Sequence, residues 1–68
     1  MMREKILSAA ESYFLGKIDF HRVNLEVYLE NSAGIGEHSD IMGAVESELA
    51  KIAEFEEKLS VLRNLDDT

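Results

Sequence analysis

The chain has 68 residues, no cysteine and no proline, and its 14 acidic and 7 basic residues give a formal net charge of −7. A chain of this length supports one domain with a marginal core, because so short a chain buries only about 60% of the surface that it exposes when unfolded. The absence of cysteine excludes disulfides and thiolate metal sites, so oligomerisation is the remaining way to stabilise so small a fold.

The negative charge is concentrated in the second half of the chain. Residues 33–68 hold nine acidic residues and only three basic ones, Lys51, Lys58 and Arg63. This half of the chain therefore carries a net charge of −6 out of the total of −7. Such a surface repels phosphates and anionic headgroups, so we expect no nucleic acid and no membrane as a partner. We interpret it as a solvated face, and a basic protein is the partner class that it would attract. There is neither an apolar run of roughly 18 residues nor a signal peptide, which predicts a cytoplasmic protein.

Residues 3–31 are predicted to form one long helix. At 100° per residue its polar side chains occupy a narrow strip, and apolar side chains cover well over half of the circumference. Gly16 allows two interpretations: an unbroken helix that another helix approaches closely, or a break near residues 16–18 with Asp19 capping a second segment. We favour the unbroken helix, because the apolar pattern stays in phase across the glycine.

This apolar surface is broader than one antiparallel neighbour can cover, so its second side is expected to meet another subunit. A dimer forming a four-helix bundle is the simplest solution, and trimers and tetramers stay open. The residues expected in the oligomer interface are Tyr13, Lys17, Phe20, His21, Asn24, Val27 and Tyr28. The four that form a polar ladder, Lys17, His21, Asn24 and Tyr28, suit a network that fixes helix register; a proton-transfer or ligand site is the alternative.

Residues 32–39 are predicted to form the turn between two helices. Gly34 suits the left-handed position beyond a helix end, and Ser39 is expected to cap the next helix, with His38 as the alternative cap. Glu37, His38 and Asp40 are residue types that bind zinc or manganese, but a second nearby histidine is lacking. We therefore interpret them as a cap and a solvated turn, and we predict no metal and no cofactor.

Residues 40–64 are predicted to form a second helix with a single apolar stripe. The stripe comprises Ile41, Val45, Leu49, Ile52, Phe55, Leu59 and Leu62. The predicted fold is therefore all-α: residues 1–68 form one domain, an antiparallel two-helix hairpin that assembles into a homo-oligomeric helical bundle. A hairpin offers no cleft to separate the pKa values of paired carboxylates, and the serines have no adjacent base, so we predict that the protein is not an enzyme.

Three segments resemble small helical proteins of T-even-like marine phages: residues 21–31 (HRVNLEVYLEN), 34–41 (GIGEHSDI) and 48–53 (ELAKIA). The likeness covers residues 17–62, and its most distinctive part is the Gly-Ile-Gly-Glu-His sequence at 34–38. Those proteins often have proline after the histidine, whereas this chain has Ser39. The resemblance implies a helical hairpin and a phage or marine environmental origin, and a phage-encoded chain would work in the host cytoplasm. It assigns no biochemical activity, because those proteins have none assigned. We expect a non-enzymatic accessory or assembly factor; the alternative is an acidic regulatory binder of a basic host or viral protein.

Overall fold

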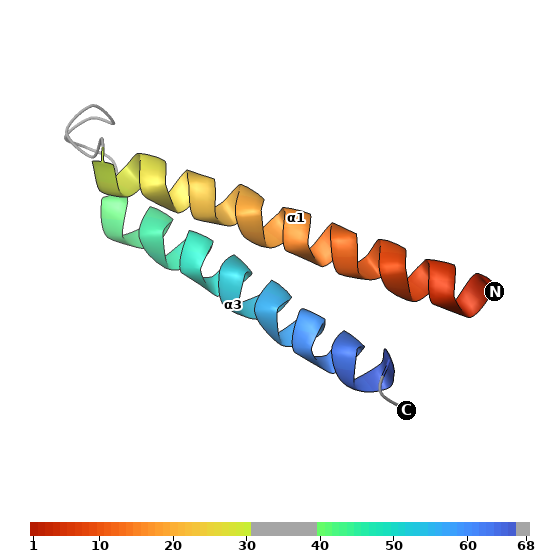
Figure 1. The fold of residues 1–68 in the computed structure, drawn as a ribbon. Helices are drawn as coiled ribbons and strands as arrows, with labels where there is room; N and C mark the ends of the chain where they lie inside the picture. The colour runs from red at the N-terminus through yellow and green to blue at the C-terminus, as the bar shows by residue number, and fades with distance from the viewer. Residues whose placement is uncertain (31–39, 67–68) are drawn as a thin grey trace.

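The structure, a computed structural model, describes residues 1–30 and 40–66. It contains helix α1 (Met2–Glu30) and helix α3 (Ile41–Asp66). The two helices lie side by side and run in opposite directions, so both chain ends lie at the same end of the molecule (Figure 1). The hairpin measures 52 × 15 × 14 Å. The prediction of an all-helical hairpin is confirmed, while the predicted turn at 32–39 lies outside the described residues.

Helix α1 runs through Gly16 without a break, as the phase of its apolar residues predicted. Its 29 residues correspond to a length of about 43 Å at 1.5 Å per residue. Glycine in a helix interior is tolerated when the neighbouring turns hold the helix in place. Here the buried Ile18 and the half-buried Phe14 lie on either side of Gly16 and pack toward α3.

Asp40 caps the start of α3. The backbone N–H of Gly43 donates to Oδ1 of Asp40 at 2.8 Å, and the N–H of Ala44 donates to the Asp40 carbonyl oxygen at 3.0 Å. A side-chain oxygen that accepts from the third helical N–H is the usual N-cap arrangement. Gly43 leaves room for it, because a Cβ at this position would collide with the Asp40 carboxylate. The caps that the sequence predicted, Ser39 and His38, lie outside the described residues.

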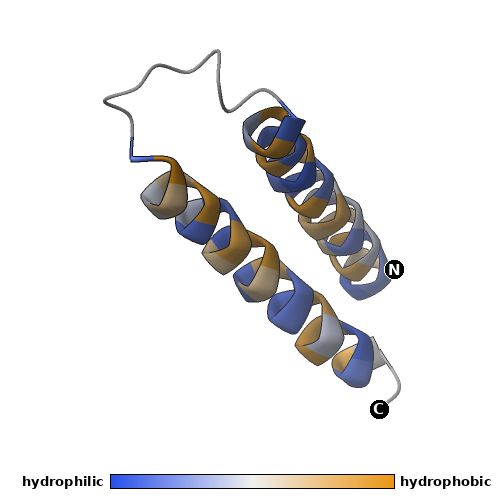
Figure 2. Cartoon of the chain, turned by 90° about the vertical axis from the view of Figure 1, so that its left-hand side faces the viewer, coloured by the Kyte–Doolittle hydropathy of each residue, from blue (hydrophilic) through white to orange (hydrophobic). Residues whose placement is uncertain are grey.

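The core between the helices is thin. Among the described residues Ile18, Ile52, Phe55 and Leu59 are buried, and Phe14 and Leu62 pack against them in half-buried positions. Other large apolar side chains of both helices remain exposed, and hydrophobic residues recur along the whole length of each helix (Figure 2). The hairpin alone thus leaves much apolar surface in water.

Leu49 was predicted to belong to the apolar stripe of the second helix, and this prediction is wrong. Leu49 is 49% exposed, whereas the neighbouring Glu48 is half-buried and faces α1. Glu48 follows Val45 by three residues and precedes Ile52 by four. Alternating steps of three and four residues keep the same side of a helix facing its partner helix. Glu48 therefore occupies a core position of the seven-residue repeat, and Leu49 is turned away from it.

Ion pairs along the edges of the hairpin join the two helices. Arg22 binds Glu56 at 2.8 Å, and Arg63 binds Glu11 at 3.3 Å, with all four side chains substantially exposed. Exposed pairs contribute little to stability. They are consistent with the antiparallel register. Within the described residues, neither helix combines the length and the apolar character that crossing a membrane requires.

Candidate functional site

A small polar cluster lies inside the seam between the helices. His21 Nδ1 is 2.7 Å from Glu48 Oε1, and the side-chain amide of Asn24 donates to the same oxygen at 3.4 Å. The side chains of His21 and Glu48 are only 12% and 15% exposed. A half-buried carboxylate in a hydrophobic seam needs such donors, because an unpaired one is costly to desolvate.

Aromatic rings and a lysine enclose this cluster. The His21 ring stacks on Phe55, with centroids 6.1 Å apart and an interplanar angle of 13°, and the Phe20 ring meets it edge-on at 5.0 Å. The Lys17 ammonium lies 5.4 Å from the Phe20 centroid and 5.6 Å from the Phe55 centroid. Both distances fall within the range of cation–π contacts. The cluster is therefore packed on its sides by Phe20, Phe55 and Lys17.

The cluster pairs a histidine with a carboxylate inside the seam between the helices. A histidine paired with a carboxylate can act as a base toward a nucleophile within hydrogen-bond reach. In residues 1–30 and 40–66, no serine hydroxyl hydrogen-bonds to His21, and Ser8, Ser12, Ser47 and Ser60 are exposed. A polar pair at a core position of a helical seam specifies which residues face one another.

The second notable feature is an exposed apolar face on α1, which we call the outer stripe. It lies beside the side of α1 that packs against α3, and the ring of Tyr13 meets Phe55 of α3 edge-on, with centroids 6.5 Å apart. The members of the outer stripe are Met2, Ile6, Ala9, Tyr13, Gly16, Phe20, Val23 and Val27, and all eight are exposed in the hairpin. Tyr13 is 59%, Phe20 57% and Val27 52% exposed. Contiguous exposed apolar surface of this kind is typical of an interaction site.

The structure divides the seven predicted interface residues into two groups. Tyr13, Phe20 and Val27 belong to the exposed outer stripe. The other four, Lys17, His21, Asn24 and Tyr28, are half-buried, and His21 and Asn24 bond to Glu48 of the same chain. The polar ladder thus lines the hairpin seam, because its steps keep it on the side of α1 that α3 covers.

Glu48 is the member of the polar cluster that the sequence analysis missed. Its charge suggested solvated surface, and the adjacent Leu49 was placed in the seam instead. The signal that identifies Glu48 is the alternation of three- and four-residue steps from Ile41 to Leu62. A strict seven-residue repeat places Ile41, Glu48, Phe55 and Leu62 at one position.

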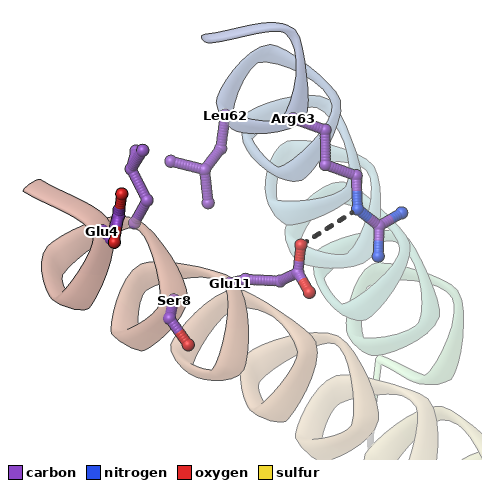
Figure 3. Close-up of a pocket in the computed structure, with 6 residues that line it drawn as sticks. Glu4, Ser8, Glu11, Leu62 and Arg63 are labelled. Carbon is purple, nitrogen blue, oxygen red and sulfur yellow. Dashed lines mark hydrogen bonds and ion pairs between the residues drawn. The ribbon is translucent and has the colours of Figure 1, made fainter. Parts of the chain in front are cut away.

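Two hollows flank the open end of the hairpin. One, of about 320 Å³, lies between Leu7 and Leu62, and Glu11 and Arg63 form an ion pair at its edge (Figure 3). The other, of about 540 Å³, is a shallow apolar groove along Phe14, Val61 and Leu65. Glu4 and Ser8 also line the first hollow, beside the Glu11–Arg63 ion pair, and the second hollow is open to solvent.

The candidate metal ligands fall mostly outside the described part of the chain. Glu37 and His38 are not described, and the carboxylate of Asp40 is engaged as the cap of α3. No group of three His, Cys, Asp or Glu side chains within residues 1–30 and 40–66 is arranged to hold a metal ion.

No protein-family model, curated protein or solved structure matches the chain. The features that bear on function are therefore those of the chain itself, the polar cluster and the outer stripe.

Proposed function

We propose that the protein is a non-enzymatic interaction protein whose working form is a homo-oligomeric bundle of helical hairpins. The observation that carries this proposal is the outer stripe, in which Tyr13, Phe20 and Val27 are each more than half exposed. Burying apolar surface contributes roughly 25 cal/mol per Å², so leaving these side chains in water forgoes several kcal/mol. Association of copies recovers that free energy for a chain whose own core is thin.

The polar cluster supports the same proposal from inside the hairpin. His21, Asn24 and Glu48 hold the two helices in one register, which fixes the position of the outer stripe relative to α3. A surface that assembles with copies of itself has to be presented in one geometry, since a slipped hairpin would offer a different pattern.

The concentration dependence of thermal unfolding tests this proposal. For an oligomer that dissociates as it unfolds, the midpoint rises with protein concentration by mass action. We expect the midpoint to rise steadily between about 1 and 100 μM, with circular dichroism as the readout. A midpoint that is unchanged over this range would contradict the proposal, because the hairpin would then unfold without dissociating from other copies.

The biological setting that we propose is a phage accessory or assembly factor in the cytoplasm of the host cell. Its support is the resemblance of residues 17–62 to small helical phage proteins, carried by the sequence around positions 34–38. Small assembly factors act by presenting surfaces rather than by chemistry, which suits a hairpin with an interaction face and a packed polar cluster.

An acidic regulatory binder of a basic protein is the second candidate function. Glu46 and Glu57 on α3 are exposed and make no ion pair with another described residue, whereas Glu54 and Glu56 are paired with cations of the same chain. Electrostatic attraction between proteins weakens as salt rises. A pull-down at low and high salt tests this function, and recovery of no salt-sensitive basic protein would count against it.

A further inference from the structure

The outer stripe follows the seven-residue repeat of a coiled coil. Its members succeed one another at alternating steps of four and three residues along α1. One position of the repeat holds Ile6, Tyr13, Phe20 and Val27, and the other holds Met2, Ala9, Gly16 and Val23. This spacing keeps one face of a helix in contact with a partner helix when the two helices wind around each other in a slight left-handed supercoil.

We propose that the partner is the α1 helix of a second copy, packed antiparallel, with Tyr13 of each copy facing Gly16 of the other. The inference rests on the proposed function and adds to it the identity, direction and register of the contact. In this register all eight members of the outer stripe are paired. The pairs, each formed twice by two-fold symmetry, are Met2 with Val27, Ile6 with Val23, Ala9 with Phe20, and Tyr13 with Gly16.

The alternation of residue sizes favours the antiparallel direction. In a parallel pair identical residues meet, so a layer of two Tyr13 rings would adjoin a layer of two Gly16 residues that leaves a void. Protein interiors are densely packed, and both voids and overfilled layers are unfavourable. In the antiparallel pair each aromatic ring meets the smallest residues of the outer stripe, Tyr13 meeting Gly16 and Phe20 meeting Ala9. The layers then have comparable volumes.

Gly16 has no explanation within the hairpin. A Cβ at this position would meet nothing within 4 Å, so alanine would fit and would strengthen the helix. In the proposed dimer the space beside Gly16 receives the Tyr13 ring of the second copy. Glycine in a helix face allows this close approach.

Charges beside the outer stripe agree with the same register. In an antiparallel pair centred between residues 14 and 15, Lys5 of one copy flanks the seam next to Glu26 of the other. Both side chains are exposed, and neither makes an ion pair with another described residue of the hairpin. Opposite charges at flanking positions set partner orientation in coiled coils.

The proposed contact places the acidic helix on the outside. At 100° per residue, the outer stripe and the side of α1 that faces α3 are roughly 140° apart around the helix axis. A second α1 therefore packs on a different side of the helix from α3. The two α1 helices form the middle of the assembly, and α3 with its exposed Glu46 and Glu57 remains in solvent.

Replacing Gly16 with leucine tests the contact with little effect on the hairpin. In the isolated hairpin Gly16 is exposed and its Cβ position meets nothing within 4 Å, whereas in the dimer the leucine would occupy the place of the Tyr13 ring. We expect Gly16→Leu to reduce the mass measured by light scattering from two chains to one at the same concentration. Ala53→Leu on the exposed face of α3 is the matched control and should leave the dimer intact. A Gly16→Leu protein that remains dimeric would overturn the proposed contact.

Spin-label distances test direction and register on the assembled protein, which lacks cysteine of its own. Labels are attached to Glu4→Cys in one sample and to Glu30→Cys in another. At 1.5 Å per residue, the register predicts axial separations between copies of about 32 Å at residue 4 and about 47 Å at residue 30. A parallel pair would give short distances at both sites. A slip of one repeat would shorten one distance by about 10 Å and lengthen the other.

The outcomes separate this inference from the proposed function. A wild-type chain that is monomeric at every concentration contradicts both. A stable oligomer with short label distances, or one that Gly16→Leu does not dissociate, contradicts the antiparallel contact and leaves the homo-oligomer standing.

Discussion

His21 and Glu48 form a half-buried polar pair, 2.7 Å apart, at a position of the helical seam where the repeat would otherwise place two apolar residues. The neighbouring layer, formed by Phe14 and Phe55, is aromatic, with ring centroids 6.0 Å apart. Polar pairs within an apolar seam sacrifice some stability for a defined register. This pair explains how a hairpin with so thin a core holds its two helices in one alignment.

The pair should behave as a unit in stability measurements. We expect His21→Leu to lower the free energy of unfolding by about 1–3 kcal/mol, because Glu48 keeps only the longer contact with Asn24. His21→Leu combined with Glu48→Leu should lie within about 1 kcal/mol of the wild type, since an apolar pair fills the same layer. Urea denaturation of the wild type, both single variants and the double variant measures the coupling. Additive effects of the two substitutions would contradict the assigned role.

The Asp40 cap should contribute to the stability of α3. Asp40→Ala removes the acceptor of the Gly43 N–H, and we expect a loss of about 0.5–2 kcal/mol in urea denaturation. Asp40→Asn is the matched control, because asparagine caps helices about as well as aspartate. If the alanine variant is as stable as the asparagine variant, the helix does not depend on this cap.

Replacing Phe20 should weaken the assembly far more than the exposure of this residue in a single hairpin suggests. Exposed residues away from special features usually change stability by less than about 0.5 kcal/mol when replaced. We expect Phe20→Glu to dissociate the assembly and to remove the concentration dependence of the unfolding midpoint, since it places a charge in the outer stripe. Leu49→Glu on α3, at a similarly exposed apolar position, should retain that dependence. Equal behaviour of the two variants would argue against an interface on α1.

Glu54 should show a pH response that depends on Lys58. The Lys58 ammonium donates to Glu54 at 2.8 Å, and this hydrogen bond, helped by Lys51, lowers the pKa of the Glu54 carboxyl. Because the folded-state pKa is lowered, the stabilisation is present above the ordinary carboxyl pKa and is lost as pH falls through the lowered value. NMR titration of Lys58→Met should show the pKa of Glu54 moving up toward its ordinary value. An unchanged pKa would assign the shift to another cause.

Much of the hairpin could be predicted because its signals are local. The phase of the apolar residues across Gly16 predicted an unbroken first helix, and the stripe through Ile52, Phe55 and Leu59 predicted the seam of the second. Exposure of Tyr13 and Phe20 in the hairpin agrees with the expectation that α3 alone cannot cover α1.

The polar residues were harder to place, because charge alone does not show which side of a helix faces a neighbour. Glu48 was interpreted as surface since acids are rarely buried without a partner, and its partner, His21, lies 27 residues away in the chain. The cap at Asp40 was not predicted, because Ser39 and Asp40 are both good cap residues and the local sequence does not distinguish them.

Light scattering of the wild-type protein across a dilution series, with helix content measured on the same samples, tests the central claim most directly. The outer stripe predicts a mass of two chains at micromolar concentration, and dissociation on dilution accompanied by a loss of helix. A fully helical single chain at micromolar concentration would contradict it, because Tyr13, Phe20 and Val27 would then stay more than half exposed to water.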